Sequence, residues 1–333
     1  MTATGAALAS EPLWSWVDAD HLVVQGEQFT VAPFQPPGED HLLVIKTPEM
    51  VQQYLDLVAA ERPRRIVELG TKEGGSTALL AMVTDPDLIV SVDLAPEVPA
   101  RLAALIRDRN LHDRVVPVAG LDQGDRSALT ERMDALLGTE ALDFVVDDAS
   151  HILGPTRTSL EVLLPRLRPG GIYVVEDWAA EYATACELAR HIEPTSPDFA
   201  GRLDLIRGLV LLLNSPGSNV PAEVVAALAA THQQQRAARG AGEGSQITDL
   251  LNVIVATAAT ADLTALAGVV PDAPRPLADL AVELAMVTAG NPGVIAEIRL
   301  DRHWIWMRRG DEPLPRDGFR LASAWGDHFG YLS

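Results

Sequence analysis

Short apolar runs alternate with amphipathic stretches through the middle of the chain. The runs are rich in β-branched residues, and they occupy 65–69, 88–93, 114–119, 142–147 and 171–177. The stretches between them carry apolar residues at helical spacing. Strands that are apolar on both faces and separated by helices are typical of a parallel sheet covered on both sides. The pattern therefore predicts an α/β fold with a doubly wound, mostly parallel sheet.

The flanking segments have different patterns. Residues 47–63 have helical periodicity, with Thr47 as a candidate N-cap, and predict a helix. An Ala- and Leu-rich region follows the last run and predicts a helical insertion, and residues 294–310 predict two strands joined by a tight turn. We therefore divide the chain into an N-terminal extension with a helix (1–60), a core (61–178), a helical insertion or lid (179–290) and a terminal antiparallel hairpin that completes the sheet (291–333).

Composition narrows the possible partners. The 333 residues include 26 Lys and Arg against 46 Asp and Glu, a formal net charge of −20, which disfavours nucleic acid and anionic membranes as partners. The single cysteine, Cys186, excludes an intramolecular disulfide and a multi-thiolate metal site. The first residues lack the pattern of a signal peptide. We expect a cytoplasmic protein.

Two Ala- and Leu-rich segments with little charge, 221–230 and 248–260, have helical periodicity. Helix faces of this kind are often buried against another subunit. We therefore expect a homo-oligomer.

A glycine-rich turn follows the first predicted strand in the sequence VELGTKEGGST, residues 67–77. A dinucleotide-binding fingerprint would need glycine at the position of Lys72. A P-loop would need a lysine between Gly75 and Ser76. Both phosphate-binding interpretations therefore fail at a specific residue. The spacing that does fit is acidic-x-Gly-x-x-x-Gly, from Glu68 through Gly70 to Gly74.

This spacing resembles motif I of the class I S-adenosylmethionine-dependent methyltransferases, whose sheet is seven-stranded with the order 3-2-1-4-5-7-6. The resemblance implies that the glycines let the methionine part of the cofactor lie along the turn. It further implies that Asp93 accepts the ribose hydroxyls and that Asp122 lies at the adenine. The residues that it places at the cofactor are Glu68, Gly70, Thr71, Gly74, Ser76, Asp93, Asp122 and Asp147. The simpler alternative is that the glycines only form a turn and Asp93 caps a helix.

Carboxylates gather at the ends of the fourth and fifth predicted strands, where Asp147–Asp148 and Glu176–Asp177 follow buried runs. These strands are neighbours in the expected order, about 4.8 Å apart. Desolvated carboxylates repel each other unless a cation compensates them, and Mg²⁺ prefers oxygen ligands. Because side chains alternate along a strand, Asp147 and Asp148 should face opposite sides of the sheet.

The motifs DDASH and VVEDW together resemble the metal-dependent O-methyltransferases of macrolide sugars, the mycinamicin 2''-O-methyltransferase and cephalosporin-hydroxylase-like group. This resemblance implies that Asp148, Glu176 and Asp177 bind Mg²⁺ and that His151 is the catalytic base, with Asp148 also assigned to catalysis. The chain departs from the motif at Ala149, where the group has glycine. The ion could instead be structural, or the carboxylates could bind none and only cap the sheet.

We therefore expect an enzyme with S-adenosyl-L-methionine and Mg²⁺ as cofactors. It would methylate a small hydroxylated acceptor, a sugar hydroxyl of a glycosylated natural product or a saccharide. One alternative is a cephalosporin-hydroxylase-like enzyme with a redox metal, although an iron site of two histidines and a carboxylate is hard to build from these residues. Another is a non-catalytic cofactor-binding protein that mediates assembly.

Overall fold

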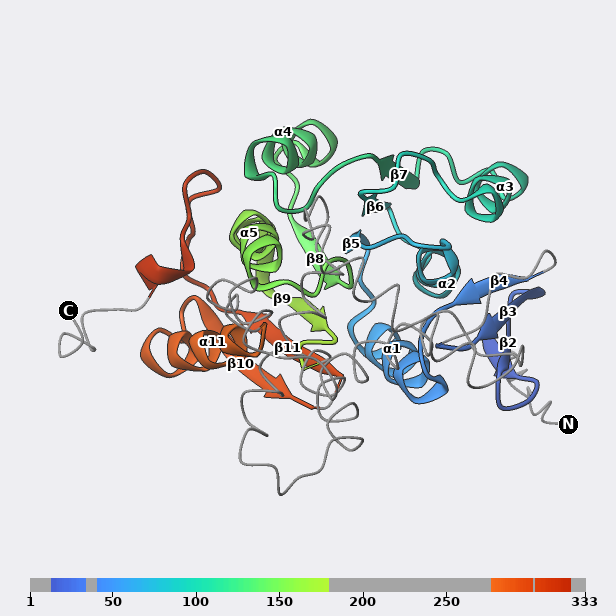
Figure 1. Cartoon of the computed structure of the whole chain (residues 1–333), viewed down its shortest axis with the longest axis horizontal. Coiled ribbons are helices and arrows are strands. Elements are labelled where there is room, and N and C mark those ends of the chain that lie inside the picture. The colour runs from blue at the N-terminus through green and yellow to red at the C-terminus, as the bar shows by residue number, and fades with distance from the viewer. Residues whose placement is uncertain (1–12, 34–40, 180–276, 302, 325–333) are drawn as a thin grey trace, which may run out of the picture.

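The computed structural model describes residues 13–33, 41–179, 277–301 and 303–324, which form two sheets and their covering helices (Figure 1). The strands are β1 (Trp14–Trp16), β2 (His21–Val24), β3 (Glu27–Val31), β4 (Leu42–Val44), β5 (Arg65–Leu69), β6 (Leu88–Asp93), β7 (Val115–Ala119), β8 (Leu142–Asp147), β9 (Leu167–Glu176), β10 (Ile295–Leu300) and β11 (Trp304–Arg309). The helices are α1 (Pro48–Glu61), α2 (Gly75–Thr84), α3 (Ala100–Asp108), α4 (Arg126–Leu137), α5 (Leu153–Leu163) and α11 (Ala278–Gly290), with 3₁₀ turns η1 (Leu164–Arg166) and η2 (Leu321–Ala324).

The main sheet has seven strands in the order β10-β11-β9-β8-β5-β6-β7. Strands β5 to β9 pair parallel with one another, whereas β11 pairs antiparallel with β9 and with β10. Counted along the chain from β5, this is the predicted order 3-2-1-4-5-7-6. The doubly wound fold and the terminal hairpin are therefore confirmed.

The strand boundaries match the predicted apolar runs closely, with one clear difference at β9. This strand begins at Leu167, four residues before the start of the predicted run at 171–177, and so includes Pro169 and Gly170. Gly170 has φ 77°, and the β8–β9 register shifts between Leu142 and Phe144. The chain therefore continues as an irregular strand through Pro169, Gly170 and Gly171. The register shift accommodates the left-handed backbone of Gly170.

Helices cover both faces of the main sheet. One face packs against α4, α5 and α11, and its core includes Val67, Val145 and Tyr173. The other face packs against α1, α2 and α3, and its core includes Ile66 and Val146. Neighbouring residues of one strand thus belong to opposite cores, as the alternation of side chains requires.

The N-terminal segment forms a second, four-stranded sheet in the order β1-β2-β3-β4, which the sequence pattern did not predict. Strands β1, β2 and β3 pair antiparallel, and β4 pairs parallel to β3 and lies against α2 (Figure 1). The predicted helix follows it directly as α1, and the Thr47 side chain caps it by accepting from the Met50 N–H at 3.3 Å. This sheet therefore attaches the start of α1 to the main sheet.

Most of the predicted insertion lies outside the described residues, including both segments on which the homo-oligomer was predicted. Within it, α11 is described and is a helix, as expected. Among the residues that the structure describes, no helix is both long and apolar enough to cross a bilayer. The domain boundaries, the homo-oligomer and the cytoplasmic location stay predictions.

Candidate active site

The two aspartates at the end of β8 face opposite sides of the main sheet, as predicted. The Asp147 carboxylate is buried on the α5 side, where it accepts from Ser159 Oγ at 2.6 Å, Tyr173 OH at 3.3 Å and Gln123 Nε2 at 3.3 Å. Burial raises its pKa to about 6, and the Ser159 hydrogen bond opposes that shift. The structure thus gives Asp147 a set of protein partners beneath the site.

Asp148 lies on the other side and shares a buried cation with the end of β9. Lys46 Nζ donates to Asp148 Oδ2 at 2.6 Å and to both oxygens of Glu176 at 2.7 Å. Tyr54 OH, from α1, donates to Glu176 Oε1 at 2.5 Å. Glu176 is 1% exposed and Lys46 is 5% exposed, so this group is shielded from water. A protein cation thus compensates two of the carboxylates for which a metal was expected.

The charges in this group act on one another. Burial alone would lower the pKa of Lys46, but the charges of Asp148 and Glu176 outweigh it and raise that pKa, so Lys46 stays protonated. Burial and the charge of Asp148 raise the pKa of Glu176, whereas Lys46 and Tyr54 oppose the rise.

A second group of ligand atoms lies at the same strand ends. Asp148, His151 and Asp177 each bring one potential ligand atom, and these atoms lie within 4.8 Å of one another. His151 Nε2 is 3.7 Å from Asp148 Oδ1. His151 and Asp177 have φ of 54° and 51°, a left-handed conformation that is uncommon outside glycine and is found at functional sites. Both residues lie in the loops that leave β8 and β9.

The glycine turn packs directly against the end of β8. A Cβ on Gly70, which has φ 94°, would lie 2.0 Å from the Asp148 carbonyl oxygen. Gly74 has φ 81°, and a Cβ there would lie 2.7 Å from Leu102 Cβ. Only glycine fits these positions, because each combines a left-handed backbone with a close neighbour. The motif glycines therefore place the turn beside the acidic group.

The predicted polar residues of this turn form a buried network. Thr71 Oγ1 lies 2.6 Å from Ser91 Oγ, and Thr77 Oγ1 donates to the Glu68 carboxylate. Ser76, in the first turn of α2, also hydrogen-bonds Glu68. Glu68 is 1% exposed, and burial raises its pKa to about 7, against the effect of these hydrogen bonds. Glu68 therefore holds the turn onto α2 from beneath.

The buried Glu68 predicts a pH dependence of stability. Because the folded-state pKa is raised above the ordinary value of 4.5, the associated stabilisation is present at low pH and is lost as the pH rises through about 7. Relative to Glu68→Gln, which does not titrate there, the wild-type free energy of unfolding should fall by about 2–3 kcal/mol between pH 5 and pH 8. Urea denaturation of both cofactor-free proteins across this range measures the difference. If the free energies of unfolding of the two proteins changed equally with pH, the predicted role of Glu68 would be contradicted.

The two acids that were expected at the adenosine lie at the ends of β6 and β7. Asp93 accepts from the Lys72 N–H and from the Ala95 N–H, both at 2.8 Å. Asp122 is exposed and accepts from the Gly124 N–H at 2.7 Å. Each carboxylate oxygen has two lone pairs, so these loop contacts leave acceptor capacity. Their roles toward a cofactor stay predictions.

Lys46 and Tyr54 are the residues that the sequence interpretation missed. Lys46 follows the apolar run Leu42–Val44 and Ile45, and it precedes the helix N-cap. An apolar strand that ends in a charged residue was the signal that identified Asp148, and the same signal was present here. Tyr54 carried no such signal, since it reads as part of the apolar face of α1.

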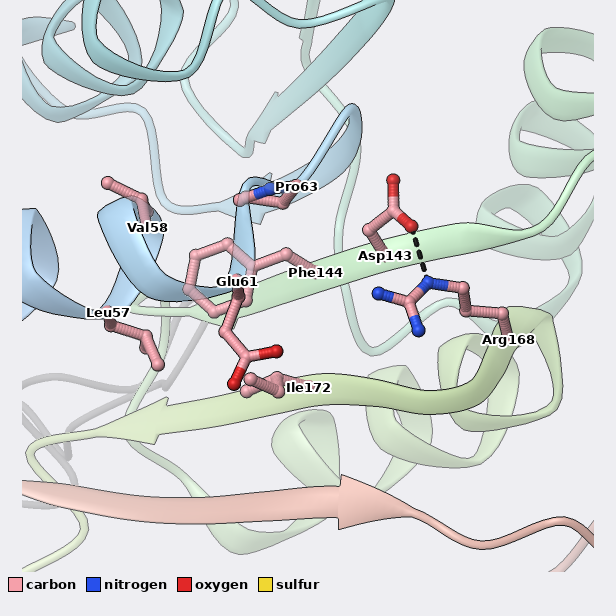
Figure 2. A pocket seen from close by; sticks show the side chains of 8 residues that line it. All are labelled: Leu57, Val58, Glu61, Pro63, Asp143, Phe144, Arg168 and Ile172. Atoms are coloured by element: carbon pink, nitrogen blue, oxygen red, sulfur yellow. Dashed lines mark hydrogen bonds and ion pairs between the residues drawn. The ribbon is translucent and has the colours of Figure 1, made fainter.

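A small pocket lies at the other end of these strands (Figure 2). It is lined by Leu57, Val58, Glu61, Pro63, Asp143, Phe144, Arg168 and Ile172. Arg168 Nε donates to Asp143 at 2.6 Å beside it. None of the predicted site residues lines this pocket, so it is separate from the acidic strand ends.

Comparison with known proteins finds similarity over the core of the chain. Residues 67–178 match the family model "Methyltransferase domain". The chain is 32% identical over 151 residues to the 8-demethyl-8-alpha-L-rhamnosyl tetracenomycin-C 2'-O-methyltransferase of Streptomyces olivaceus, over 43% of this chain and 36% of that protein. It is 56% identical over 39 residues to the mycinamicin VI 2''-O-methyltransferase of Micromonospora griseorubida, over 11% of this chain and 10% of that protein.

Solved structures are also similar. The MycE methyltransferase of the mycinamycin pathway, solved with Mg, SAH and mycinamycin VI, has a TM-score of 0.40 at 18% identity, over 85% of this chain and 52% of that chain.

The chain spans little more than a third of the length of the tetracenomycin relative, and less of the mycinamicin relative. The matched region nevertheless contains the glycine turn and both acidic strand ends. The strand order agrees with it independently. Residues 67–178 therefore match a methyltransferase domain, and the main sheet has the strand order of the class I methyltransferase fold.

Proposed function

We propose that this protein is an S-adenosylmethionine-dependent O-methyltransferase that requires Mg²⁺ and methylates a sugar hydroxyl of a glycosylated natural product or a saccharide. The methyltransferase domain and the sugar O-methyltransferases among its relatives support the reaction class. The observation that carries the proposal is the convergence of Asp148, His151 and Asp177 beside the Gly70 turn.

The cofactor would lie along the turn from Gly70 to Gly74. Thr71 and Ser76 stabilise this turn from within, and Glu68 anchors it. Asp93 would accept the ribose hydroxyls and Asp122 would lie near the adenine, as the resemblance implies. The turn contacts the end of β8, so a ligand bound along it would lie near the acidic group.

The residues at the strand ends fit a hard divalent cation. Asp148 and Asp177 offer carboxylate oxygens within 4.8 Å of each other, and Glu176 lies at the same strand end. We infer that these three carboxylates would hold Mg²⁺, which prefers oxygen ligands. A bound Mg²⁺ would supply Lewis acidity that lowers the pKa of an acceptor hydroxyl.

His151 is the proposed base. Its Nε2 lies 3.7 Å from Asp148 Oδ1, and its side chain is 34% exposed, so an acceptor can reach it. The acceptor oxygen forms a bond to the methyl carbon as the sulfur–methyl bond breaks. The hydroxyl proton passes to the imidazole, and S-adenosylhomocysteine leaves.

Replacing His151 should separate this role from folding. We expect His151→Gln to lower kcat by about 10²–10³-fold, the range of a general base, with little change in the melting temperature. Its pH–rate profile should also lose the limb that reports deprotonation of the base. Steady-state kinetics across pH measures both. An unchanged profile would assign His151 to another role.

The reaction itself can be tested by mass spectrometry. The protein is incubated with S-adenosylmethionine and candidate glycosylated acceptors, with Mg²⁺ or with excess chelator. We expect a mass gain of one methylene unit that is located on the sugar and is lost with chelator. If the mass gain persists with excess chelator, the reaction does not require a metal ion. If the protein binds S-adenosylmethionine but methylates none of the acceptors, the non-catalytic alternative is favoured. Turnover with Mg²⁺ as the sole metal would exclude a redox-metal hydroxylase.

A further inference from the structure

We propose that Lys46 is a built-in counter-ion that competes with the divalent cation for Asp148 and Glu176, so that the cation binds only as the Lys46 ammonium leaves these carboxylates. This inference rests on the metal site of the proposed function. It adds a residue from outside the matched methyltransferase domain to the control of that site.

The contacts of Lys46 are those of a specific internal ion pair. Its ammonium donates to one oxygen of Asp148 and to both oxygens of Glu176, all within 2.7 Å. The side chain is 5% exposed, so solvent screens the pair weakly. The positive charge of Lys46 thus compensates the two carboxylates and keeps them close together, as a bound metal ion would.

Asp148 lies between the Lys46 ammonium and the position proposed for the divalent cation. Its Oδ2 binds Lys46, while its Oδ1 lies on the side of His151. A divalent cation that bound Asp148 and Asp177 would therefore lie only a few ångströms from the ammonium. Two cations at that distance repel each other, and the burial of Lys46 weakens the screening by solvent on its side. Glu176 is occupied as well, because Lys46 contacts both of its oxygens and Tyr54 contacts one.

The structure also offers the ammonium another position. A cavity beside it is lined by Val44, Lys46, Val51, Tyr54, Glu68, Ser76, Leu79, Leu80 and Val146. Glu68 is the carboxylate in this lining and already interacts electrostatically with Lys46. Movement of the ammonium from Asp148 toward Glu68 would keep it beside a buried carboxylate of the same cavity. We infer that this cavity receives the displaced ammonium.

The backbone of Lys46 is held firmly in place. It lies between β4 and the capped start of α1. A Cβ on Gly75 would lie 2.0 Å from the Leu43 carbonyl oxygen, so β4 packs directly on the start of α2. The small N-terminal sheet thus inserts Lys46 into the site, and only its side chain needs to move.

Titration calorimetry tests the competition. Mg²⁺ is titrated into the full chain without cofactor for the wild type, Lys46→Met and the control Lys72→Met, which removes the charge of the exposed loop lysine. We expect Lys46→Met to bind Mg²⁺ at least about tenfold more tightly than the wild type, and Lys72→Met to stay within about threefold. Equal or weaker binding by Lys46→Met, or no binding by either protein, would overturn the proposal. Lys46→Gln serves in its place if Lys46→Met does not fold.

A measurement on the wild type avoids substitution altogether. The sequence contains two lysines, Lys46 and the loop residue Lys72, so ¹³C-lysine labelling produces two sets of side-chain signals. We expect the Lys46 Cε signal to shift saturably with Mg²⁺ while the Lys72 signal stays. Mg²⁺ binding in calorimetry with an unmoved Lys46 signal would contradict the displacement. Chelator-sensitive methyl transfer would then still stand, so failure of this inference is distinguishable from failure of the proposed function.

Discussion

Asp148→Ala is expected to lower kcat by about 10³-fold or more while the dissociation constant for S-adenosylmethionine changes only a few-fold. The Asp148 side chain contacts Lys46 and lies beside His151, whereas Gly70 of the glycine turn packs against its backbone. Losing a ligand of a catalytic cation removes several kcal/mol of transition-state stabilisation, and each 1.4 kcal/mol is tenfold in rate. Steady-state kinetics and cofactor calorimetry on the same preparation measure the two effects.

Asp143→Asn is the matched control for that experiment. Asp143 lies near the start of β8, whereas Asp148 follows its end, and it accepts from the Arg64 and Arg65 N–H groups and from Arg168. Its replacement can lower stability and should leave kcat near the wild-type value. If Asp148→Ala loses cofactor affinity to the same extent as turnover, the separation between the metal ligand and the cofactor turn is wrong.

Gly70→Ala should be the most damaging substitution for folding and cofactor binding. The added Cβ would lie 2.0 Å from the Asp148 carbonyl oxygen, and neither can move away easily because each is fixed by the backbone of a packed segment. A left-handed alanine costs about 1–2 kcal/mol and overpacking about 1–3 kcal/mol more, so we expect a loss of about 3 kcal/mol in the free energy of unfolding. Urea denaturation measures it, and cofactor calorimetry should show no binding.

Gly26→Ala separates the two causes of that loss. Gly26 has φ 82°, close to that of Gly70, but a Cβ there would meet nothing within 4 Å. Its substitution should therefore cost only the backbone strain of about 1–2 kcal/mol and leave cofactor binding intact. Equal losses for the two alanines would show that the contact with β8 is unimportant.

The sheet and its order were predictable from local patterns. Runs such as Arg65–Leu69 and Leu142–Asp147 are apolar on both faces, which only a covered parallel sheet explains, and both strands begin and end where predicted. The opposite directions of Asp147 and Asp148 follow from the geometry of a strand. The small N-terminal sheet was missed because β1 and β4 have three residues each, too few for a periodic signal.

The sequence by itself determined which chemistry the strand ends carry: a glycine turn, adjacent carboxylates and a histidine, at positions set by strand length and alternation. Only the tertiary structure decided how those carboxylates are compensated. Lys46 lies 102 residues before Asp148 and 130 before Glu176, and Tyr54 lies 122 before Glu176. No local pattern encodes contacts at such separations, because they arise when the small sheet and α1 dock on the main sheet. The charge balance of the site is therefore a property of that packing.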